Sequence, residues 1–243
     1  MSGVHAETIT LHTSGGPMQC QLRVPAGEGR HGAVIVVPEA FGVTPGIVAE
    51  CDRLAAAGYL ALGIEIFHRT APAGFVSSKF DFAEVGAHFK ALTNDGLADD
   101  LLAARAFLAA HPRCNGKLGV VGYCVGGFAA YLGACRTKLS ASVVYYGGGI
   151  VSARPQISAL SPLLGERVTC PVLGLFGATD SSISESDRAA IDAALARQGV
   201  EHELVAYAGA GHAFRNDERP AYHREAADAS WLKALAFLGK HLQ

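Results

Sequence analysis

The feature of this sequence that most constrains its fold is an apolar segment broken by glycines, Gly122-Tyr-Cys-Val-Gly-Gly127. The apolar residues at 118–121 predict a buried strand before it, and residues 128–135 predict a helix after it. A side chain at either glycine flanking Cys124 would collide across a sharp turn, and the last glycine allows close helix packing. The pattern therefore predicts a strand-turn-helix unit that presents a thiol above a sheet.

A second interpretation of Cys124 is structural, because a free cysteine in an apolar stretch often behaves as a small buried hydrophobe. That interpretation does not explain the two flanking glycines or the strand-to-helix context. They favour a nucleophile at position 124.

Composition is consistent with a large buried core. Of 243 residues, 50% are hydrophobic and 17% are charged, which suits parallel strands buried on both faces. Because folds of this type often reach this length as one unit, we expect a single domain over 1–243.

The net charge is −2 and the chain has no basic run, so we expect neither nucleic acid nor an anionic membrane as partner. The uncharged window 118–135 is long enough to span a bilayer, but its glycines and the predicted turn argue against a membrane helix.

Six cysteines show no spacing typical of zinc ligands or of a redox pair. The N-terminus has neither the positive nor the apolar region of a secretory signal. We therefore expect reduced thiols, a cytoplasmic location, and no metal or cofactor.

Predicted strands and helices alternate along the chain after an opening hairpin. We expect strands near 5–12, 18–24, 33–37, 59–64, 118–121, 141–146, 172–176 and 203–206, and helices near 46–57, 94–110, 127–136, 185–198 and 221–241. Thr44 and Pro45 predict a helix start, and Gly58 and Gly199 predict helix ends. This order predicts an α/β fold, a mostly parallel sheet with helices on both faces. The segments 65–92 and 147–169 read as irregular and could form a pocket or lid.

A thiol nucleophile needs a base, because the thiolate attacks and the thiol scarcely does. In the α/β-hydrolase order the acid and then the histidine follow the nucleophile. His212 stands in a glycine-containing loop after the strand at 203–206, where a base can reach the thiol. His223 and His241 fall in the terminal helix and are expected on the surface. An ordinary loop histidine is the alternative for His212.

The acid is expected after a late strand, and the segment 172–180 ends in Gly-Ala-Thr-Asp180. This turn lies at the carboxyl end of its strand, where ligand sites of such sheets occur. Asp180 is therefore the expected acid of a triad, with N-capping of the next helix as the alternative.

Acyl transfer also needs donors for the oxyanion. We expect one to be the backbone N–H of Val125, directly after the nucleophile, and the other to be the N–H of Ala40 in the loop after strand 33–37. Phe41 is the next candidate for the second donor. Phe41 and Tyr123, beside these donors, are also expected to contact substrate.

Taken together, four motifs resemble the dienelactone hydrolase family over essentially the whole chain. They are Pro38-Glu-Ala-Phe-Gly42, the glycine turn around Cys124, Gly177-Ala-Thr-Asp180 and Gly211-His-Ala-Phe214. The resemblance implies an α/β-hydrolase fold and a Cys124-Asp180-His212 triad acting on a lactone or ester. It also implies that Glu39 interacts with the resting thiol and shifts when substrate binds. The alternative for Glu39 is a surface loop residue, although a charge inside so apolar a stretch is costly to bury.

The family also uses arginines to hold a substrate carboxylate. Arg69 matches the first of these by position, with pairing to Glu65 or Glu84 as its alternative. The second is matched poorly, since Asn216 stands four residues past the histidine with Arg215 beside it. We therefore expect Arg69, Arg215 and Asn216 near the substrate, while dienelactone itself is in doubt.

The sequence thus predicts a hydrolase that opens a small lactone or carboxylic ester through an acyl-enzyme, as a monomer or small homo-oligomer. A thioesterase or another carboxylesterase is one alternative. A protein of the same fold that binds a ligand, or that senses oxidation through Cys124, is a second alternative of another class.

Overall fold

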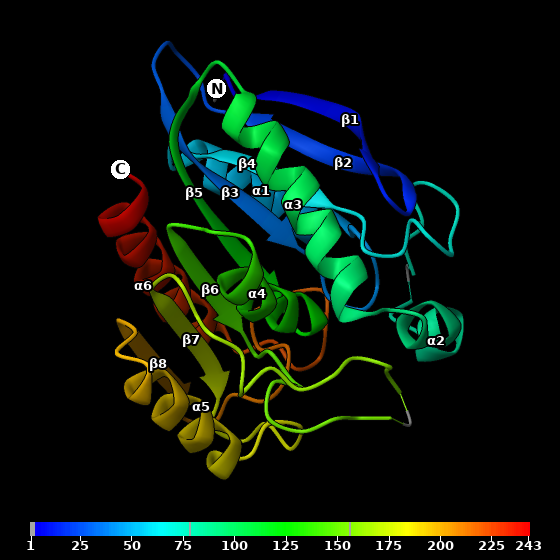
Figure 1. Ribbon diagram of the computed structural model, residues 1–243, viewed down its shortest axis with the longest axis vertical. Coiled ribbons are helices and arrows are strands. Elements are labelled where there is room, and N and C mark those ends of the chain that lie inside the picture. The colour runs from blue at the N-terminus through cyan, green and yellow to red at the C-terminus, as the bar shows by residue number, and fades with distance from the viewer. Residues whose placement is uncertain (1–2, 78, 156) are drawn as a thin grey trace.

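One eight-stranded sheet forms the centre of the computed structural model, which describes residues 3–77, 79–155 and 157–243 (Figure 1). The strands are β1 (His5–Thr13), β2 (Gly16–Val24), β3 (His31–Val37), β4 (Leu60–Ile64), β5 (Cys114–Tyr123), β6 (Ala141–Tyr145), β7 (Val172–Gly177) and β8 (His202–Tyr207). Their order across the sheet is β1-β2-β4-β3-β5-β6-β7-β8. The hairpin β1–β2 joins β4 antiparallel, and all neighbours from β4 across to β8 are parallel. The carboxyl ends of the parallel strands therefore share one edge.

Helices cover both faces of this sheet. They are α1 (Pro45–Ala56), α2 (Phe82–Lys90), α3 (Asn94–Ala110), α4 (Val125–Arg136), α5 (Glu185–Arg197) and α6 (Arg224–Leu242). In Figure 1, α3, α4 and α5 lie in front of the sheet and α1 and α6 lie behind it. This arrangement is the α/β-hydrolase fold that the sequence predicts.

The central strands are apolar along their whole length because both of their faces are covered. Every residue of β4, β6 and β7 is buried. Helix boundaries follow the predicted signals: Thr44 accepts a hydrogen bond from the N–H of Ile47, and Pro45 is the first residue of α1. Gly58 and Gly199 follow the ends of α1 and α5 with φ of 93° and 66°, which glycine adopts without strain.

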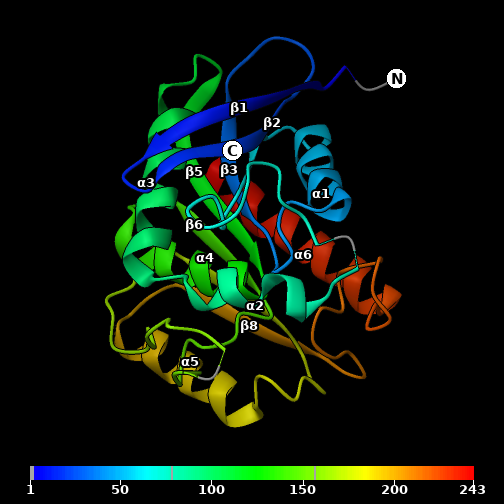
Figure 2. The ribbon, with the colours of Figure 1, turned by 90° about the vertical axis from the view of Figure 1, so that its right-hand side faces the viewer.

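The alternation of strands and helices is confirmed, but the interpretation of 65–92 as irregular is wrong at α2. This helix is nine residues long, begins after the N-cap Asp81 and buries only Val85 among its members. Such a short helix has little apolar face, so periodicity gives no signal for it. Figure 2 shows α2 lying across the carboxyl-end edge of the sheet.

The expectation that His223 and His241 lie on the surface is wrong for both residues. His223 is half-buried and caps α6 by accepting a hydrogen bond from the N–H of Ala226. His241 is half-buried, with its ring 4.7 Å from that of Phe237 and its Nε2 3.4 Å from Glu201. Both histidines therefore belong to the packing of α6.

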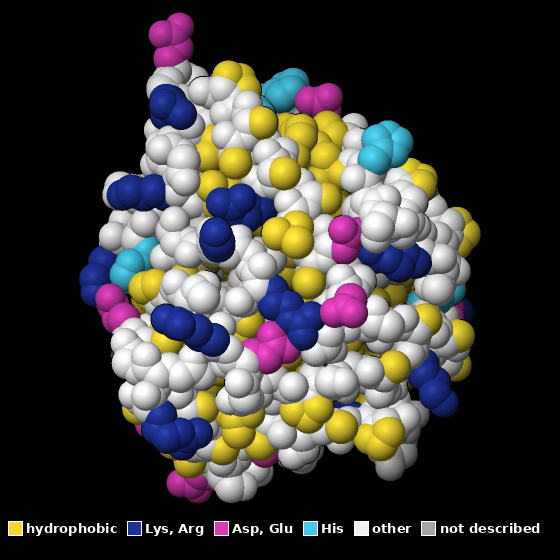
Figure 3. Space-filling model, in the orientation of Figure 1, with side chains coloured by type: hydrophobic (Ala, Val, Ile, Leu, Met, Phe, Trp, Pro, Cys, Tyr) yellow, Lys and Arg dark blue, Asp and Glu magenta, His cyan; other side chains and the backbone are white. Residues whose placement is uncertain are grey.

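The six cysteines of the described chain are free thiols, as their spacing predicts. The window 118–135 is divided between β5 and α4, and none of the helices in the described ranges is long and apolar enough to cross a bilayer. On the face drawn in Figure 3, basic and acidic side chains are interspersed.

The glycine at position 126 gives a test of the strand-to-helix turn. A Cβ there would overlap the carbonyl oxygens of Val37 and Pro38, which are backbone atoms and cannot move aside cheaply. We expect Gly126→Ala to lower the free energy of unfolding by about 3 kcal/mol. Urea denaturation followed by circular dichroism measures this change.

Gly86→Ala is the matched control, because a Cβ at this position in α2 meets nothing within 4 Å. It should raise the free energy of unfolding by about 0.5–1 kcal/mol, the usual gain when alanine replaces a helical glycine. Equal effects of the two substitutions would contradict the packing argument.

Candidate active site

Cys124 lies in a strained turn between β5 and α4. Its φ of 56° and ψ of −115° are unusual for a residue with a side chain, and its N–H donates to the carbonyl of Tyr145 at 3.1 Å. A Cβ on Gly122 would overlap the carbonyl of Gly126, and one on Gly127 would come 2.5 Å from the carbonyl oxygen of Tyr145. Glycine is therefore required at all three positions, and together the three glycines fix the direction of the thiol.

His212 and Asp180 meet at the carboxyl ends of β8 and β7. The Nδ1 atom of His212 lies 2.7 Å from Oδ2 of Asp180, and the Asp180 side chain is fully buried. Oδ1 of Asp180 accepts from the N–H of Ser182 at 2.7 Å, which fixes the carboxylate. The N-cap of α5 is Ser184, so the alternative role of Asp180 as that cap is wrong.

The loops that carry these two residues are joined by hydrogen bonds. Both the N–H and the hydroxyl of Thr179 donate to the carbonyl of Ala210, at 2.9 and 2.8 Å. Gly177 lies so close to the 210–211 backbone that a Cβ there would come 2.5 Å from two carbonyl oxygens. The turn of the acid and the loop of the base therefore form one unit.

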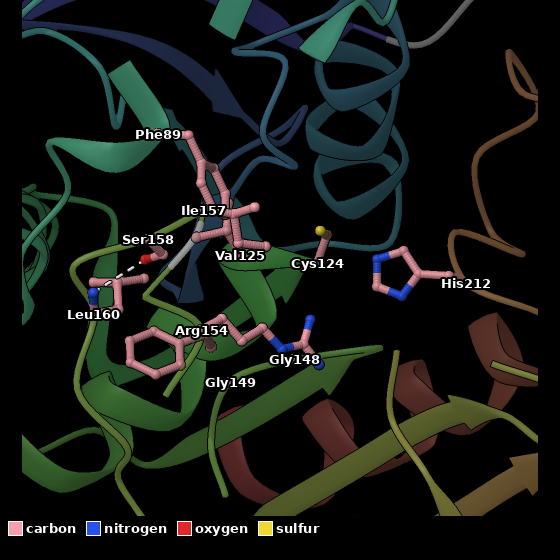
Figure 4. Close-up of a pocket in the computed structure, with 11 residues that line it drawn as sticks. Phe89, Cys124, Val125, Gly148, Gly149, Arg154, Ile157, Ser158, Leu160 and His212 are labelled. Atoms are coloured by element: carbon pink, nitrogen blue, oxygen red, sulfur yellow. Dashed lines mark hydrogen bonds between the residues drawn. The ribbon is translucent and has the colours of Figure 1, made fainter. Parts of the chain in front are cut away.

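The imidazole of His212 lies beside the side chain of Cys124 in Figure 4. Burial by itself lowers the pKa of His212, but the neighbouring Cys124 and the hydrogen bond to Asp180 outweigh it and raise this pKa to about 10. An imidazole in this setting holds a proton readily, which is what activation of a thiol requires.

Glu39 is a buried carboxylate at this site, with 4% of its surface exposed, so the alternative of a surface glutamate is wrong. Its Oε1 accepts from the Tyr146 hydroxyl and its Oε2 from the Asn216 amide, each at 3.0 Å. Nη1 of Arg219 lies 3.8 Å from Oε2. Burial raises the pKa of Glu39, while Asn216 and Arg219 oppose that rise. Among the described residues, these are the partners of Glu39, and Cys124 is not one of its hydrogen-bond partners.

The two expected oxyanion donors lie on either side of the nucleophile turn. Val125 is the first residue of α4, where N–H groups have no carbonyl partner within the helix. Ala40 is fully buried in the loop after β3, and a Cβ on Gly126 would overlap the carbonyls of Val37, the last residue of β3, and of Pro38 in that loop. The loop and the start of α4 are therefore in direct contact, as a shared oxyanion site requires.

A cavity opens beside the thiol (Figure 4). Its walls come from α2, from the start of α4 and from the 147–169 segment, which the sequence predicts as a pocket region. The lining residues are Phe89, Cys124, Val125, Phe128, Gly148, Gly149, Arg154, Ile157, Ser158, Leu160 and His212. Most of them are apolar, so the cavity suits a small and largely apolar ligand.

Three of the expected substrate-contacting residues, Tyr123, Arg215 and Asn216, line a cavity other than that of the thiol. Tyr123 and Arg215 are 2% and 8% exposed, and both line a second cavity that they share with Glu39 and Asn216. The Arg215 guanidinium pairs with Glu50, 2.9 Å away. Phe41, 1% exposed, packs its ring against those of Phe80 and Phe82. Phe41, Tyr123, Arg215 and Asn216 are therefore absent from the described lining of the thiol cavity.

Arg69 also lies away from that cavity. Its guanidinium is 2.8 Å from Asp100 and 3.3 Å from Asp99, both in α3. The alternative pairing with Glu65 or Glu84 is wrong, because the acidic partners of Arg69 come from α3. Among the described lining residues, the cavity does not include Arg69.

Sequence reasoning missed two residues of the site. Tyr146 follows β6 with φ of 37°, donates to Glu39 and places its ring 5.2 Å from the imidazole of His212. Arg154 lines the cavity from the 147–169 segment. Tyr146 could have been found from the sequence, because it follows the strand next to that of the nucleophile. Arg154 stands in no motif.

Comparison with known proteins is consistent with this geometry. A family model described as "Dienelactone hydrolase family" matches residues 18–242. A Synechocystis protein named "Putative carboxymethylenebutenolidase" is 32% identical over 214 residues, which cover 87% of each chain. A Bradyrhizobium protein named "Probable 2-oxo-3-(5-oxofuran-2-ylidene)propanoate lactonase" is 30% identical and covers 96% of this chain and 94% of its own.

A solved structure gives the same result for the fold. The crystal structure titled as a putative dienelactone hydrolase from Klebsiella pneumoniae superposes with a TM-score of 0.85. It is 30% identical and covers 98% of this chain and 99% of its own. The similarity therefore extends over nearly the whole of both chains.

Replacing the buried carboxylate tests the electrostatics of the imidazole. Because Asp180 raises the pKa of His212, Asp180→Asn should lower that pKa by roughly 1 to 3 pH units. The measurement is an NMR titration of the His212 ring. An unchanged titration midpoint would show that Asp180 does not act on the imidazole.

Proposed function

Because the chain belongs to the dienelactone hydrolase family, we propose that it opens a small lactone or ester through a Cys124-His212-Asp180 triad. The chain is a carboxylic ester hydrolase of this family. To this activity the proposal adds two points. It names the residues that carry out the reaction, and it states that the intermediate is a covalent acyl-enzyme. It needs no metal or cofactor, because a thiolate, an imidazole and backbone donors suffice for acyl transfer.

The observation that carries the proposal is the position of His212 between the thiol and a buried carboxylate. One side of the imidazole is held by Asp180 at 2.7 Å, and the other faces Cys124 (Figure 4). Asp180 fixes the orientation of the ring and stabilises its protonated form.

In the first half of the reaction, His212 takes the proton of the thiol and the sulfur of Cys124 attacks the carbonyl carbon. The electron pair of the carbonyl moves to its oxygen, which accepts hydrogen bonds from the N–H groups of Ala40 and Val125. The tetrahedral intermediate then collapses and the C–O bond to the leaving alcohol breaks. The imidazolium gives its proton to the oxygen of the leaving alcohol, and the acyl group remains on Cys124 as a thioester.

In the second half, water replaces the alcohol. His212 removes a proton from the water, and the hydroxide attacks the thioester carbonyl. Collapse of the second intermediate expels the sulfur, which regains its proton from the imidazolium. A lactone substrate leaves as a single hydroxy acid, and an ester leaves as an acid and an alcohol.

We assign to Glu39 the control of the resting thiol. Its carboxylate lies in the same buried polar cluster as Tyr146, whose ring contacts the imidazole. Burial raises the pKa of Glu39, and its hydrogen bonds to Asn216 and Tyr146 and the charge of Arg219 oppose that rise. A negative charge on it disfavours a thiolate nearby until substrate enters.

Replacement of the nucleophile tests the proposal. Cys124→Ala should lower kcat by roughly 10⁴-fold or more, because the remaining residues cannot form a thioester. The rate is measured with phenyl acetate and with a small lactone.

Cys135→Ser is the matched control, since this half-buried free thiol lies in the last turn of the helix that begins after Cys124. It should keep most of the activity. Equal activity of the Cys124→Ala protein and the unchanged protein would overturn the triad.

A further inference from the structure

We propose that the buried ion pair between Glu50 and Arg215 sets the proton affinity of Glu39, which makes both members of the pair positioning residues for this carboxylate. The inference rests on the proposed control of the resting thiol by Glu39 and adds the groups that hold that control in place. Neither a sequence motif nor the family resemblance assigns this role to the pair.

The three charged side chains line one cavity, although they come from three parts of the chain. Glu39 lies in the loop after β3, Glu50 lies in α1, and Arg215 lies in the loop that carries His212. Their exposed fractions are 4%, 5% and 8%, so each is largely removed from solvent. Charges around a buried space interact more strongly than the same charges on a surface, because less water screens them.

Two residues that line this cavity have capacity for a further hydrogen bond. The Tyr123 hydroxyl and Nε of Arg215 are buried, and neither has a hydrogen-bond partner within residues 3–77, 79–155 and 157–243. The cavity volume that is open to the centre of a water molecule is about 20 Å³, and one water needs roughly 10–15 Å³. The space therefore suits water held by these two groups. Such water extends the hydrogen bonds of the ion pair into the space that Glu39 lines.

The ion pair is held from several sides. Nη2 of Arg215 lies 2.9 and 3.1 Å from the two carboxylate oxygens of Glu50, and the guanidinium carbon lies 5.2 Å from the ring centre of Trp231. Burial lowers the pKa of Arg215, but the charge of Glu50 opposes this effect, and the pKa stays above its ordinary value. Nη1 of Arg53 lies 2.6 Å from Glu50, so Glu50 has a basic partner besides Arg215.

Stability alone does not explain a buried ion pair. Apolar side chains of similar volume often stabilise such a position as well or better, because two charges lose their hydration on burial. The pair instead places one negative and one positive charge at the cavity that Glu39 lines. The charge of Arg215 favours ionised Glu39 and the charge of Glu50 disfavours it. The two effects oppose one another, and loss of either charge would leave the other uncompensated.

Other titratable and charged groups also surround Glu39. Tyr146 donates a hydrogen bond to it, and Nη1 of Arg219 lies 3.8 Å away. The charge of His212 lowers the pKa of Glu39. The remaining groups of this kind on the adjoining elements are Cys124, Tyr123, Asp217 and Glu218. All of these groups are kept in the variants of the ion pair, so differences between the variants report the pair itself.

The test is a carbon-13 NMR titration of the Glu39 carboxyl group, in protein labelled at the side-chain carboxyl carbon of glutamate. The Glu39 resonance is the one that is lost in Glu39→Gln. Glu50→Gln should lower the titration midpoint of Glu39 by about 0.5–1.5 pH units, because the charge of Arg215 then acts alone. Arg215→Gln should raise the midpoint by a similar amount, since Glu50 stays charged beside Arg53.

Three further variants separate charge from packing. The double variant of Glu50→Gln with Arg215→Gln removes both charges, so its midpoint should return close to that of the unchanged protein. Arg215→Lys keeps the positive charge and should also give a midpoint close to the original. Asp52→Asn is the matched control. Asp52 lies in the same helix as Glu50, pairs with Arg23 at 2.6 Å and is absent from the described lining of this cavity, so its replacement should leave the midpoint unchanged.

Shifts of the same sign in Glu50→Gln and Arg215→Gln would overturn the inference, since a structural disturbance does not depend on the sign of the charge removed. An unchanged midpoint in Glu50→Gln would overturn it too. This variant keeps a hydrogen-bond acceptor for both arginines, so it decides the question even if Arg215→Gln does not fold.

The pH profile of Cys124 alkylation by iodoacetamide tests the proposed function separately. If Glu39 controls the thiol, this profile should shift with the Glu39 midpoint in each variant. Opposite midpoint shifts with an unchanged alkylation profile would support the effect of the ion pair on Glu39 and overturn the control of the thiol by Glu39.

Discussion

The close approach of three backbone segments around Cys124 is the constraint on which the rest of the structure depends. β5 must turn into α4 within one residue, and that residue has φ of 56°. Glycines at 122, 126 and 127 allow the turn, the β3 loop and the end of β6 to touch. This contact places the thiol, the β3 loop with Ala40 and the first N–H groups of α4 together at the carboxyl-end edge of the sheet. A bulky residue at any of the three glycines would separate them.

The sequence predicts most of the fold and the residues of the proposed triad, because each has a local signal. Buried parallel strands are apolar throughout, and helix starts and ends carry proline and glycine. Asp180 and His212 each follow directly after a strand, and parallel strands bring their carboxyl ends to one edge. Their contact at 2.7 Å therefore follows from order along the chain.

The remaining parts of the site depend on side-chain directions, which order along the chain does not determine. Asn216 and Glu39 are both named from the sequence, but the hydrogen bond between them depends on how the loop after His212 folds back. Arg69 matches a family position, yet α3 presents two aspartates to it. α2 and Arg154 lie in segments without periodicity or motif, so only the folded chain brings them to the cavity.

Detection of the covalent intermediate tests the central claim most directly. The protein is mixed with a slowly hydrolysed aryl ester, quenched in acid during turnover, digested and analysed by mass spectrometry. The account predicts that the peptide containing Cys124 gains the mass of the acyl group, and that the peptides with the other cysteines do not. Steady turnover with the acyl group on another residue, or with unmodified Cys124 at every quench time, would contradict it.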